Sequence, residues 1–322
     1  MIVTVSLNPS LDVEWLVETL HFEDRNPVLR ERRDAGGKAI NVSRVMHELR
    51  GETRCITTAG GRTGAELRER LASAKISARV VPIKGETREN LAVTQADGRR
   101  SIRLNMCGPN LSAGELRAVL SGVEDALPRA KMMVLSGSLP PNVPTDIYAR
   151  LIRLARKSGV PTALDADGEV LQRGIMARPW LVKPNRFEAE RLLGRKIRDP
   201  RRAAIEIMER WNLGVVLLSL GKDGAIVVSR QGRGAHLGGQ DCTTICLRAN
   251  SPPVRVRSAI GAGDSALAAF LLRWLKMRDA GESLRWAMAA GAACAMTPAT
   301  ELCHRRDVER LVKRVRVEAG ES

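Results

Sequence analysis

The sequence has few of the residues on which disulfide scaffolds and stacking nucleic-acid binders depend. Its six cysteines are scattered through 322 residues, a pattern that excludes a dense disulfide framework and predicts reduced thiols. Cys242 and Cys246 lie four residues apart, but no second close pair or nearby histidine completes a zinc set. Aromatic residues make up only 3% of the chain, which argues against aromatic platforms for single-stranded nucleic acid.

Long apolar runs are also missing. No stretch of 18 apolar residues occurs in the sequence, whereas a membrane-spanning helix needs about 20. The segment 1–6 has neither the basic region nor the long apolar stretch of a secretory signal. These absences predict no membrane partner and a cytoplasmic protein.

Positive charge, in contrast, is in excess. Lys and Arg together number 52 against 36 Asp and Glu, so the formal net charge is +16. Such a balance invites a nucleic-acid interpretation, but the basic residues are spread along the chain and no zinc-finger, RNP or basic-zipper pattern occurs. We expect no nucleic-acid partner, and a basic surface also attracts anionic phosphate metabolites.

Short apolar segments alternate with helical patterns along most of the chain. The helical spacing of the apolar residues in 39–49, with Gly51 as a stop, predicts a helix there. The expected strands are 2–7, 132–135, 162–164, 181–182 and 215–218. This alternation predicts an α/β fold with a mainly parallel, doubly wound sheet flanked by helices. We expect a single domain covering 1–322.

Two regions depart from this alternation and indicate antiparallel strands. They are 27–33 and 79–106, the second with Asp97-Gly98 as a tight hairpin turn. A small β-sheet lid is therefore expected from about 12–34 and 79–106. A sheet too small for its own core is a candidate lid over a site or a dimer surface.

The segment 258–265 carries the sharpest local signal, because Gly261-Ala262-Gly263-Asp264 opens an apolar helix. Glycines let the backbone approach an anion closely, and the free amides of a helix N-terminus stabilise negative charge. Asp264 fits two interpretations, a simple N-terminal helix acid or a carboxylate that takes a proton from a hydroxyl beside an anion hole. The spacing alone leaves both open.

Another glycine cluster, 35–42, also opens a helix. It lacks the spacing of a nucleotide P-loop, and neither cluster has the Rossmann pattern. Polar residues also follow several expected strands, where ligands gather in open α/β sheets. These strand ends are 7–12, 135–141, 164–165, 183–188 and 219–224, and together they predict one ligand crevice.

The order of these segments resembles the ribokinase-like (PfkB) family of carbohydrate kinases over nearly the whole chain. The two signature regions of the family are similar to 36–42 with 60–64 and to 261–265. Between them lie segments similar to further family elements, 87–90, 136–141, 183–188 and 219–221. The resemblance implies a ribokinase-like fold and an ATP-dependent phosphotransferase with an alcohol group as acceptor.

Within the family, the branch that phosphorylates already phosphorylated hexoses carries motifs similar to 7–12, 87–90 and 136–141. The resemblance therefore implies a phosphofructokinase-type kinase of glycolysis that uses ATP and Mg²⁺. Lys38 resembles the lysine of the Gly-Gly-Lys-Gly motif in 1-phosphofructokinases and tagatose-6-phosphate kinases. The segments 88–109 and 300–303, in contrast, are more similar to type II 6-phosphofructokinases. We expect fructose 6-phosphate as acceptor, with the other two substrates, or a non-catalytic sugar-phosphate sensor, as alternatives.

The resemblance also implies residue roles. Asp264 would be the general base, with the amides of Gly261, Ala262 and Gly263 as the anion hole. Acceptor binding is expected from Asp12, Gly36, Gly37, Lys38, Asn41, Arg88, Asn90, Ser138, Arg25 and Arg103. The nucleotide would lie along Lys183, Asn185, Ser219, Gly221, Gly224 and Gly263, with Asn185 and Glu188 holding Mg²⁺ through water. Members of the branch commonly form homodimers through the lid sheet, and the same is expected here.

The sequence departs from the family pattern at three places. Ala39 replaces the fourth residue of the usual Gly-Gly-x-Gly run, and a methyl group there would crowd the acceptor pocket if the position needs positive φ. The other two departures are Ala259 with Ile260, before Gly261, and Ala299, before Thr300. Asp264 and its neighbouring glycines are intact, which predicts that the catalytic chemistry is retained.

Overall fold

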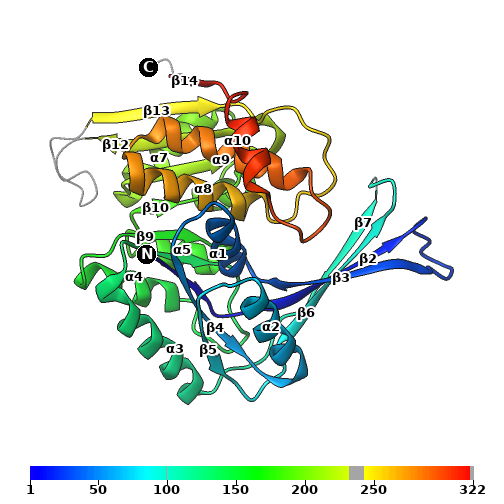
Figure 1. Ribbon diagram of the computed structural model, residues 1–322. Helices are drawn as coiled ribbons and strands as arrows, with labels where there is room; N and C mark the ends of the chain where they lie inside the picture. Colours follow the sequence, from blue (N-terminus) through cyan, green and yellow to red (C-terminus); the bar gives the residue numbers. More distant parts are fainter. Residues whose placement is uncertain (99, 232–242, 320–322) are drawn as a thin grey trace.

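The computed structural model describes residues 1–98, 100–231 and 243–319, which form two sheets and their covering helices (Figure 1). The large sheet has the strand order β14-β13-β12-β11-β10-β9-β8-β1-β4-β5. Its strands from β11 to β5 run parallel, and β12, β13 and β14 are antiparallel. The α/β fold with a mainly parallel sheet is therefore confirmed.

The bounds of the strands in the large sheet agree closely with the apolar segments of the sequence. These strands are β1 (Ile2–Ser6), β4 (Thr53–Ala59), β5 (Ala78–Pro82), β8 (Met132–Ser136), β9 (Thr162–Asp165), β10 (Leu181–Val182), β11 (Val215–Ser219), β12 (Ala225–Gln231), β13 (Thr243–Ala249) and β14 (Val317–Ala319). All five strands expected at 2–7, 132–135, 162–164, 181–182 and 215–218 are present.

Helices cover both faces of the large sheet (Figure 1). One face packs on α3 (Ala113–Ala126), α4 (Ile147–Lys157), α5 (Gly168–Ile175), α6 (Arg186–Leu193) and α7 (Pro200–Trp211). The other packs on α1 (Lys38–Glu48), α8 (Ala262–Met277), α9 (Ala280–Ala295) and α10 (Arg305–Val312). Along β1 the side chains alternate between these cores, since Val3 and Val5 enter the first and Ile2 the second.

The small sheet projects from the body and has the order β3-β2-β6-β7 (Figure 1). Its strands are β3 (Val28–Gly36), β2 (Ser10–Val17), β6 (Arg88–Gln95) and β7 (Ser101–Asn105). β6 and β7 pair antiparallel, as the hairpin expected around Asp97-Gly98 requires. β2 and β6, however, pair in parallel, which the sequence analysis did not anticipate.

One strand was assigned to the wrong sheet. The expected lid region 79–106 includes β5, but β5 pairs in parallel with β4 at the edge of the large sheet. Local periodicity distinguishes a strand from a helix but carries no information about the sheet that the strand joins. α2 (Gly61–Ser73) connects these two strands and packs against β4 and the small sheet.

Among the described residues, no helix is long and apolar enough to cross a membrane. The cysteines in the described part of the chain, Cys55, Cys107, Cys246, Cys294 and Cys303, are free. Cys242 lies outside the described residues, so the expectation that Cys242 and Cys246 form no zinc site remains a prediction from the sequence.

Candidate functional site

A crevice of about 910 Å³ lies at the carboxyl ends of the parallel strands, beneath the small sheet. It is lined from both sheets and from the N-termini of α1 and α8. The predicted site residues that line it are Asp12, Gly37, Lys38, Asn41, Arg88, Asn90, Arg103, Ser138, Lys183, Asn185, Glu188, Ser219, Gly261, Gly263 and Asp264. Residues spread over most of the chain therefore meet in one cavity.

The N-terminus of α8 forms one wall of the crevice. Gly261 is the N-cap residue and has a φ of 75°, and a Cβ on it would lie 2.4 Å from Leu302 Cδ2. Only glycine fits that turn without strain. The Ala262 amide makes one long hydrogen bond of 3.4 Å to Ala259 O. The first-turn amides otherwise lack partners within the helix, as helix N-termini do, and present a partial positive charge to the crevice.

Asp264 is the third residue of α8 and is buried, with 6% of it exposed. Its Oδ2 accepts a 2.9 Å hydrogen bond from Asn41 Nδ2 at the start of α1. Burial raises the pKa of the Asp264 carboxyl to about 6, although the charge of Lys38 and the Asn41 bond oppose that rise. A carboxylate with a pKa near neutrality is well suited to accept a proton.

Asp165 is the most important site residue that the expected roles omitted. It ends β9, is 1% exposed, and lies 3.3 Å from Lys38 Nζ and 3.2 Å from Lys183 Nζ. Burial raises the pKa of Asp165, but the two ammonium groups outweigh it and hold that pKa below its usual value. Asp165 also raises the pKa of Lys38 above that of a free lysine. The position of Asp165 at the end of a strand was the feature of the sequence that could have identified it as a site residue.

The two lysines hold positive charge at the centre of the crevice. The Lys183 ammonium would lie 3.4 Å from a Cβ built on Gly263, so it faces the N-terminus of α8. Lys38 is the first residue of α1 and acts on both Asp165 and Asp264. An anion bound at the α8 N-terminus would therefore contact helix amides and two ammonium groups.

Asn185 and Glu188 form a reciprocal cap at the start of α6. The Asn185 side chain accepts from Glu188 N–H at 2.9 Å, and Glu188 Oε2 accepts from Asn185 N–H at 2.8 Å. Burial raises the pKa of Glu188, with a further contribution from Asp165. The cap uses only one Glu188 oxygen, and both residues line the crevice. Ser219 lies beside Asn185 through an isolated parallel bridge.

The other end of the crevice is built by the small sheet. Asp12 Oδ1 accepts hydrogen bonds from Ser10 Oγ at 2.6 Å and Asn90 Nδ2 at 3.0 Å. Burial raises the pKa of Asp12. A Cβ on Gly36 would lie 2.2 Å from the Asp12 carboxyl group, so this glycine keeps the space that Asp12 occupies without lining the crevice itself.

Arg88 and Arg103 differ in how they are bound. The Arg88 guanidinium donates to the Asn8 and Met106 carbonyls at 2.9 and 2.7 Å and to Ser138 Oγ at 3.3 Å. Arg103, on β7, has no hydrogen-bond or ion-pair partner among the described residues and lines the same end. Burial lowers the pKa of each guanidinium. Arg88 is thus already engaged, whereas Arg103 is free to bind an anion.

Several predicted residues lie outside the lining of the crevice. Arg25 is exposed in the connection between β2 and β3, and nothing in the described chain brings it to the crevice. Gly221 begins a short 3-10 turn after β11. Gly224 has a φ of 91°, and a Cβ on it would lie 1.9 Å from Ala249 O, so packing explains this glycine. Ala262 is the first residue of α8 and adjoins the lining residues.

The three departures differ in their consequences. Ala39 is the second residue of α1, has no positive φ, and does not line the crevice, so the expected crowding does not arise. Ala259 lines the crevice. Ala299 has a φ of 33°, a conformation that favours glycine and that strains a residue with a Cβ.

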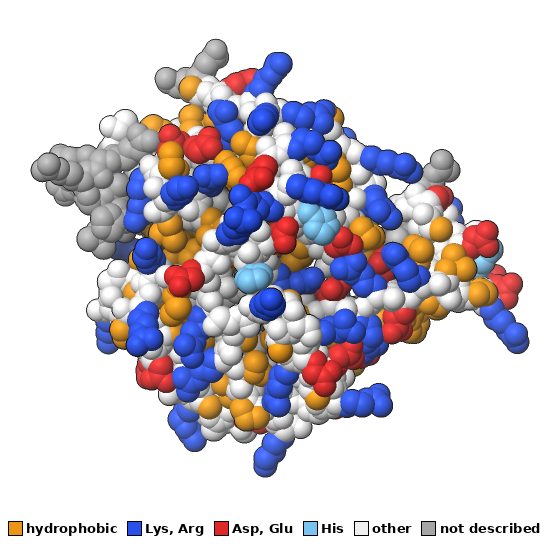
Figure 2. Space-filling view, in the orientation of Figure 1, with side chains coloured by type: hydrophobic (Ala, Val, Ile, Leu, Met, Phe, Trp, Pro, Cys, Tyr) orange, Lys and Arg blue, Asp and Glu red, His pale blue; other side chains and the backbone are white. Residues whose placement is uncertain are grey.

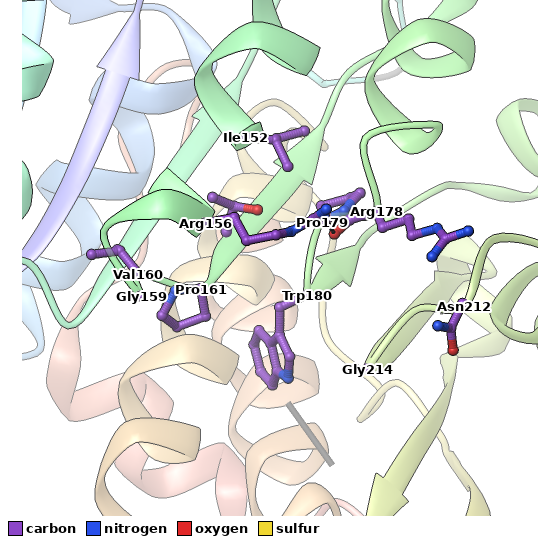
Figure 3. Close-up of a pocket in the computed structure, with 11 residues that line it drawn as sticks. Ile152, Arg156, Gly159, Val160, Pro161, Arg178, Pro179, Trp180, Asn212 and Gly214 are labelled. Atoms are coloured by element: carbon purple, nitrogen blue, oxygen red, sulfur yellow. Dashed lines mark hydrogen bonds between the residues drawn. The ribbon is translucent and has the colours of Figure 1, made fainter. Parts of the chain in front are cut away.

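A second cavity, of about 200 Å³, opens at the opposite edge of the sheet (Figure 3). It lies near the amino ends of β9 and β10, where Pro161, Arg178 and Trp180 contribute to its lining. The Arg156 guanidinium is occupied by the carbonyls of Ala177 and Arg178. None of the predicted site residues lines this cavity.

The chain is similar to known carbohydrate kinases over most of its length. Residues 6–305 match the family model described as pfkB family carbohydrate kinase. The chain is 34% identical over 312 residues to an ATP-dependent 6-phosphofructokinase isozyme 2 of Mycobacterium tuberculosis, covering 96% of this chain and 88% of that protein. It is 31% identical over 321 residues to a 1-phosphofructokinase of Borreliella burgdorferi, covering 99% and 98%.

Crystal structures of phosphofructokinase-2 from Escherichia coli have the same fold. The complex with substrates and products superposes with a TM-score of 0.86 at 30% identity, and the tetrameric inhibited form with 0.83 at 31%. Each covers 97% of this chain and 98% of the other.

The charge arrangement around Asp264 predicts a graded response of its pKa. In the wild type, ¹³C NMR titration of the Asp264 carboxyl should give a pKa of about 6. Lys38→Met removes the strongest opposing charge, so the pKa should rise further, and Lys183→Met should raise it less. A pKa that stays near the usual aspartate value in the wild type would contradict the burial described here.

Proposed function

The chain belongs to the pfkB family of carbohydrate kinases, and on that premise we propose that it transfers the γ-phosphoryl group of ATP to a hexose phosphate, with fructose 6-phosphate as the preferred acceptor. The observation that carries the proposal is the buried Asp264 beside the α8 N-terminus, flanked by two lysines. The identity of 34% and 31% to two phosphofructokinases, over 96% and 99% of this chain, supports the acceptor class.

The reaction follows from these positions. Asp264 takes the proton of the acceptor hydroxyl. The oxygen of that hydroxyl attacks the γ-phosphorus of ATP in line, and ADP leaves. The amides of Gly261, Ala262 and Gly263 stabilise the transferring phosphoryl group, and Lys183 and Lys38 add positive charge there. Asp12, Asn41 and Asn90 offer hydrogen bonds to the hydroxyls of the sugar.

The nucleotide and its metal ion fit the other half of the crevice. Lys183, Asn185 and Ser219 lie along it, and we assign Gly221 to the turn at its edge. Glu188 and Asn185 would hold Mg²⁺ through water, since their side-chain oxygens suit that ion and its hydration shell. No group of three or more His, Cys, Asp or Glu side chains in the described chain is arranged to hold a metal ion. Mg²⁺ would neutralise charge on the phosphates of ATP.

The choice of acceptor rests on the cations at the small-sheet end. A phosphate on the acceptor needs a partner there, and Arg103 is unengaged, while Arg88 retains one free N–H after its bonds to backbone and Ser138. Lys38 favours fructose 1-phosphate or tagatose 6-phosphate by its resemblance to those kinases, so both remain acceptors to compare. A cytoplasmic location, where ATP and sugar phosphates occur, accords with this activity.

The first prediction concerns turnover. With ATP and Mg²⁺, purified protein should release ADP fastest with fructose 6-phosphate, more slowly with fructose 1-phosphate or tagatose 6-phosphate, and least with fructose. Asp264→Asn should lower kcat by about 10²–10⁴-fold, the usual loss of a general base. Asp125→Asn, which removes an exposed carboxylate of α3 paired with Arg79, is the control and should stay within about twofold of wild type.

Two outcomes would contradict the proposal. Turnover with only one of the other sugar phosphates would show that this sugar phosphate, and not fructose 6-phosphate, is the acceptor. Absence of turnover with every acceptor, while isothermal titration calorimetry still detects sugar-phosphate binding, would favour a non-catalytic sensor.

The second prediction concerns Arg103. Arg103→Met should raise KM for the hexose phosphate by about tenfold or more, because a charge-assisted hydrogen bond to phosphate contributes about 1.5–3 kcal/mol. KM for ATP should change less than about twofold, since Arg103 lies at the other end of the crevice. Arg100→Met, on the same hairpin but away from the crevice, is the control. Equal effects of the two substitutions would reject a phosphate-binding role.

We further propose that the small sheet acts as a lid of a single kinase domain and pairs with that of a second copy. Large apolar side chains are exposed on or beside it: Phe22 (76%), Val28 (46%), Leu29 (59%), Leu104 (56%) and Met106 (60%). On the face drawn in Figure 2, Lys and Arg side chains are scattered over the body among uncharged and hydrophobic side chains. Burying these side chains against a second copy would stabilise a homodimer. In such a dimer Arg25, distant from its own crevice, becomes available to the partner.

The dimer predicts a specific response to charge on the lid. The double variant Leu29→Asp, Leu104→Asp should sediment as a monomer where the wild type sediments as a dimer, because each carboxylate would be desolvated in the interface. Met176→Asp, at an equally exposed apolar site next to α5 (70%), is the matched control and should leave the sedimentation unchanged. A monomeric wild type would contradict the lid interface.

A further inference from the structure

Asp34 lies near the end of β3 and collects contacts from three parts of the chain. Its carboxylate accepts from Arg32 Nε at 2.6 Å, from Thr300 Oγ1 at 2.6 Å and from Arg44 Nη2 at 3.3 Å. Burial raises the pKa of Asp34, but these partners outweigh it and hold that pKa below the usual value. Asp34 does not line the crevice.

From Thr300 the hydrogen bonds continue to the anion hole. The neighbouring carbonyl, Ala299 O, accepts from Ser258 Oγ at 3.3 Å. The Ser258 hydroxyl in turn accepts from Ile260 N–H at 3.1 Å, and Ile260 directly precedes Gly261. We call this series, Asp34, Thr300, Ser258 and Ile260, the Asp34 tether.

Two further contacts fix the surroundings of the tether. Arg44, on α1 one turn beyond Asn41, donates to Ala35 O at 2.9 Å and to Thr300 O at 3.5 Å. Cys294 Sγ lies 3.2 Å from Ile260 O. Ile260, which precedes Gly261, is therefore held at both its N–H and its carbonyl oxygen. Arg32 also bridges to Glu301 at 2.5 Å. The small sheet, α1 and the loop before α8 are therefore joined around one carboxylate.

We propose that Asp34 is a positioning residue, which through Thr300 and Ser258 holds the anion-hole amides where the transferring phosphoryl group binds. The inference rests on the proposed phosphoryl transfer. Displacing a binding group by about 1 Å can reduce a rate by about 10²-fold. Loss of the tether should therefore slow turnover more than it weakens acceptor binding.

The contacts of the preceding residue on β3, Arg33, provide a matched control. Arg33 ties the same strand to α2 through Glu66, at 3.0 Å, and also pairs with Glu89 of β6. None of its contacts leads to the anion hole. Glu66→Gln thus loosens the attachment of the small sheet without touching the tether.

The test uses Asp34→Ala and Thr300→Val, with Thr300→Ser as the conservative variant that keeps the hydroxyl. Both disruptive substitutions should lower kcat by about tenfold or more with KM for the hexose phosphate within about twofold. The double variant should be no slower than the slower single one, because both break the same tether. Thr300→Ser and Glu66→Gln should stay close to wild type, and thermal unfolding checks that each variant is folded.

A second readout does not need turnover. The affinity ratio between a non-hydrolysable ATP analogue and ADP reports how well the anion hole holds a γ-phosphate. This ratio should fall about tenfold in Asp34→Ala and Thr300→Val and stay unchanged in Glu66→Gln. Unchanged kcat and ratio in both tether variants, or an equal loss in Glu66→Gln, would overturn the proposal. A wild type without turnover would reject the proposed function, while the nucleotide ratio would still decide the tether.

Discussion

Two lysines that share one buried carboxylate set the electrostatics on which the crevice depends. Asp165 is almost fully buried and has Lys38 and Lys183 within 3.3 and 3.2 Å. An unpaired charge at that depth would be strongly unfavourable, and pairing offsets the cost only if the partners stay in place. The same two ammonium groups also face the carboxyl groups of Asp264 and Glu188, so they offset negative charge that would otherwise repel a phosphate. They also limit how far burial raises the pKa of Asp264.

The fold brings these groups together by the geometry of parallel strands. Because β1, β8, β9, β10 and β11 all end at the same edge, the polar residues after them meet there. α1 and α8 return to that edge with their N-termini, and Asn41 joins them through Asp264. The small sheet lines the other end of the crevice with Asp12, Asn90 and Arg103. The groups proposed to act in catalysis thus lie on the body of the large sheet, and those proposed to bind the acceptor lie largely on the projecting sheet.

Local patterns in the sequence were sufficient for β1, β8, β9, β10 and β11, for the helices α1 and α8, and for the polar strand ends, because each depends on neighbouring residues. Contacts between residues far apart in the sequence could not be predicted from these local patterns. The tether joins Asp34 to Thr300 across 266 positions, and the pairing of Asp165 with two lysines needs the folded sheet. β5 was placed in the wrong sheet for the same reason. The position of Arg25 was likewise inaccessible, since no local signal fixes where a hairpin tip lies.

Asp264, with its pKa raised by burial and moderated by lysines, is proposed to remove the acceptor proton. The pH dependence of kcat in the wild type and in Lys38→Met tests this role. Activity should fall below a pH of about 6, where Asp264 becomes protonated, and this limb should shift upward in Lys38→Met by the same amount as the pKa measured by NMR. A limb that stays in place while the Asp264 pKa moves would contradict the assignment of Asp264 as the base.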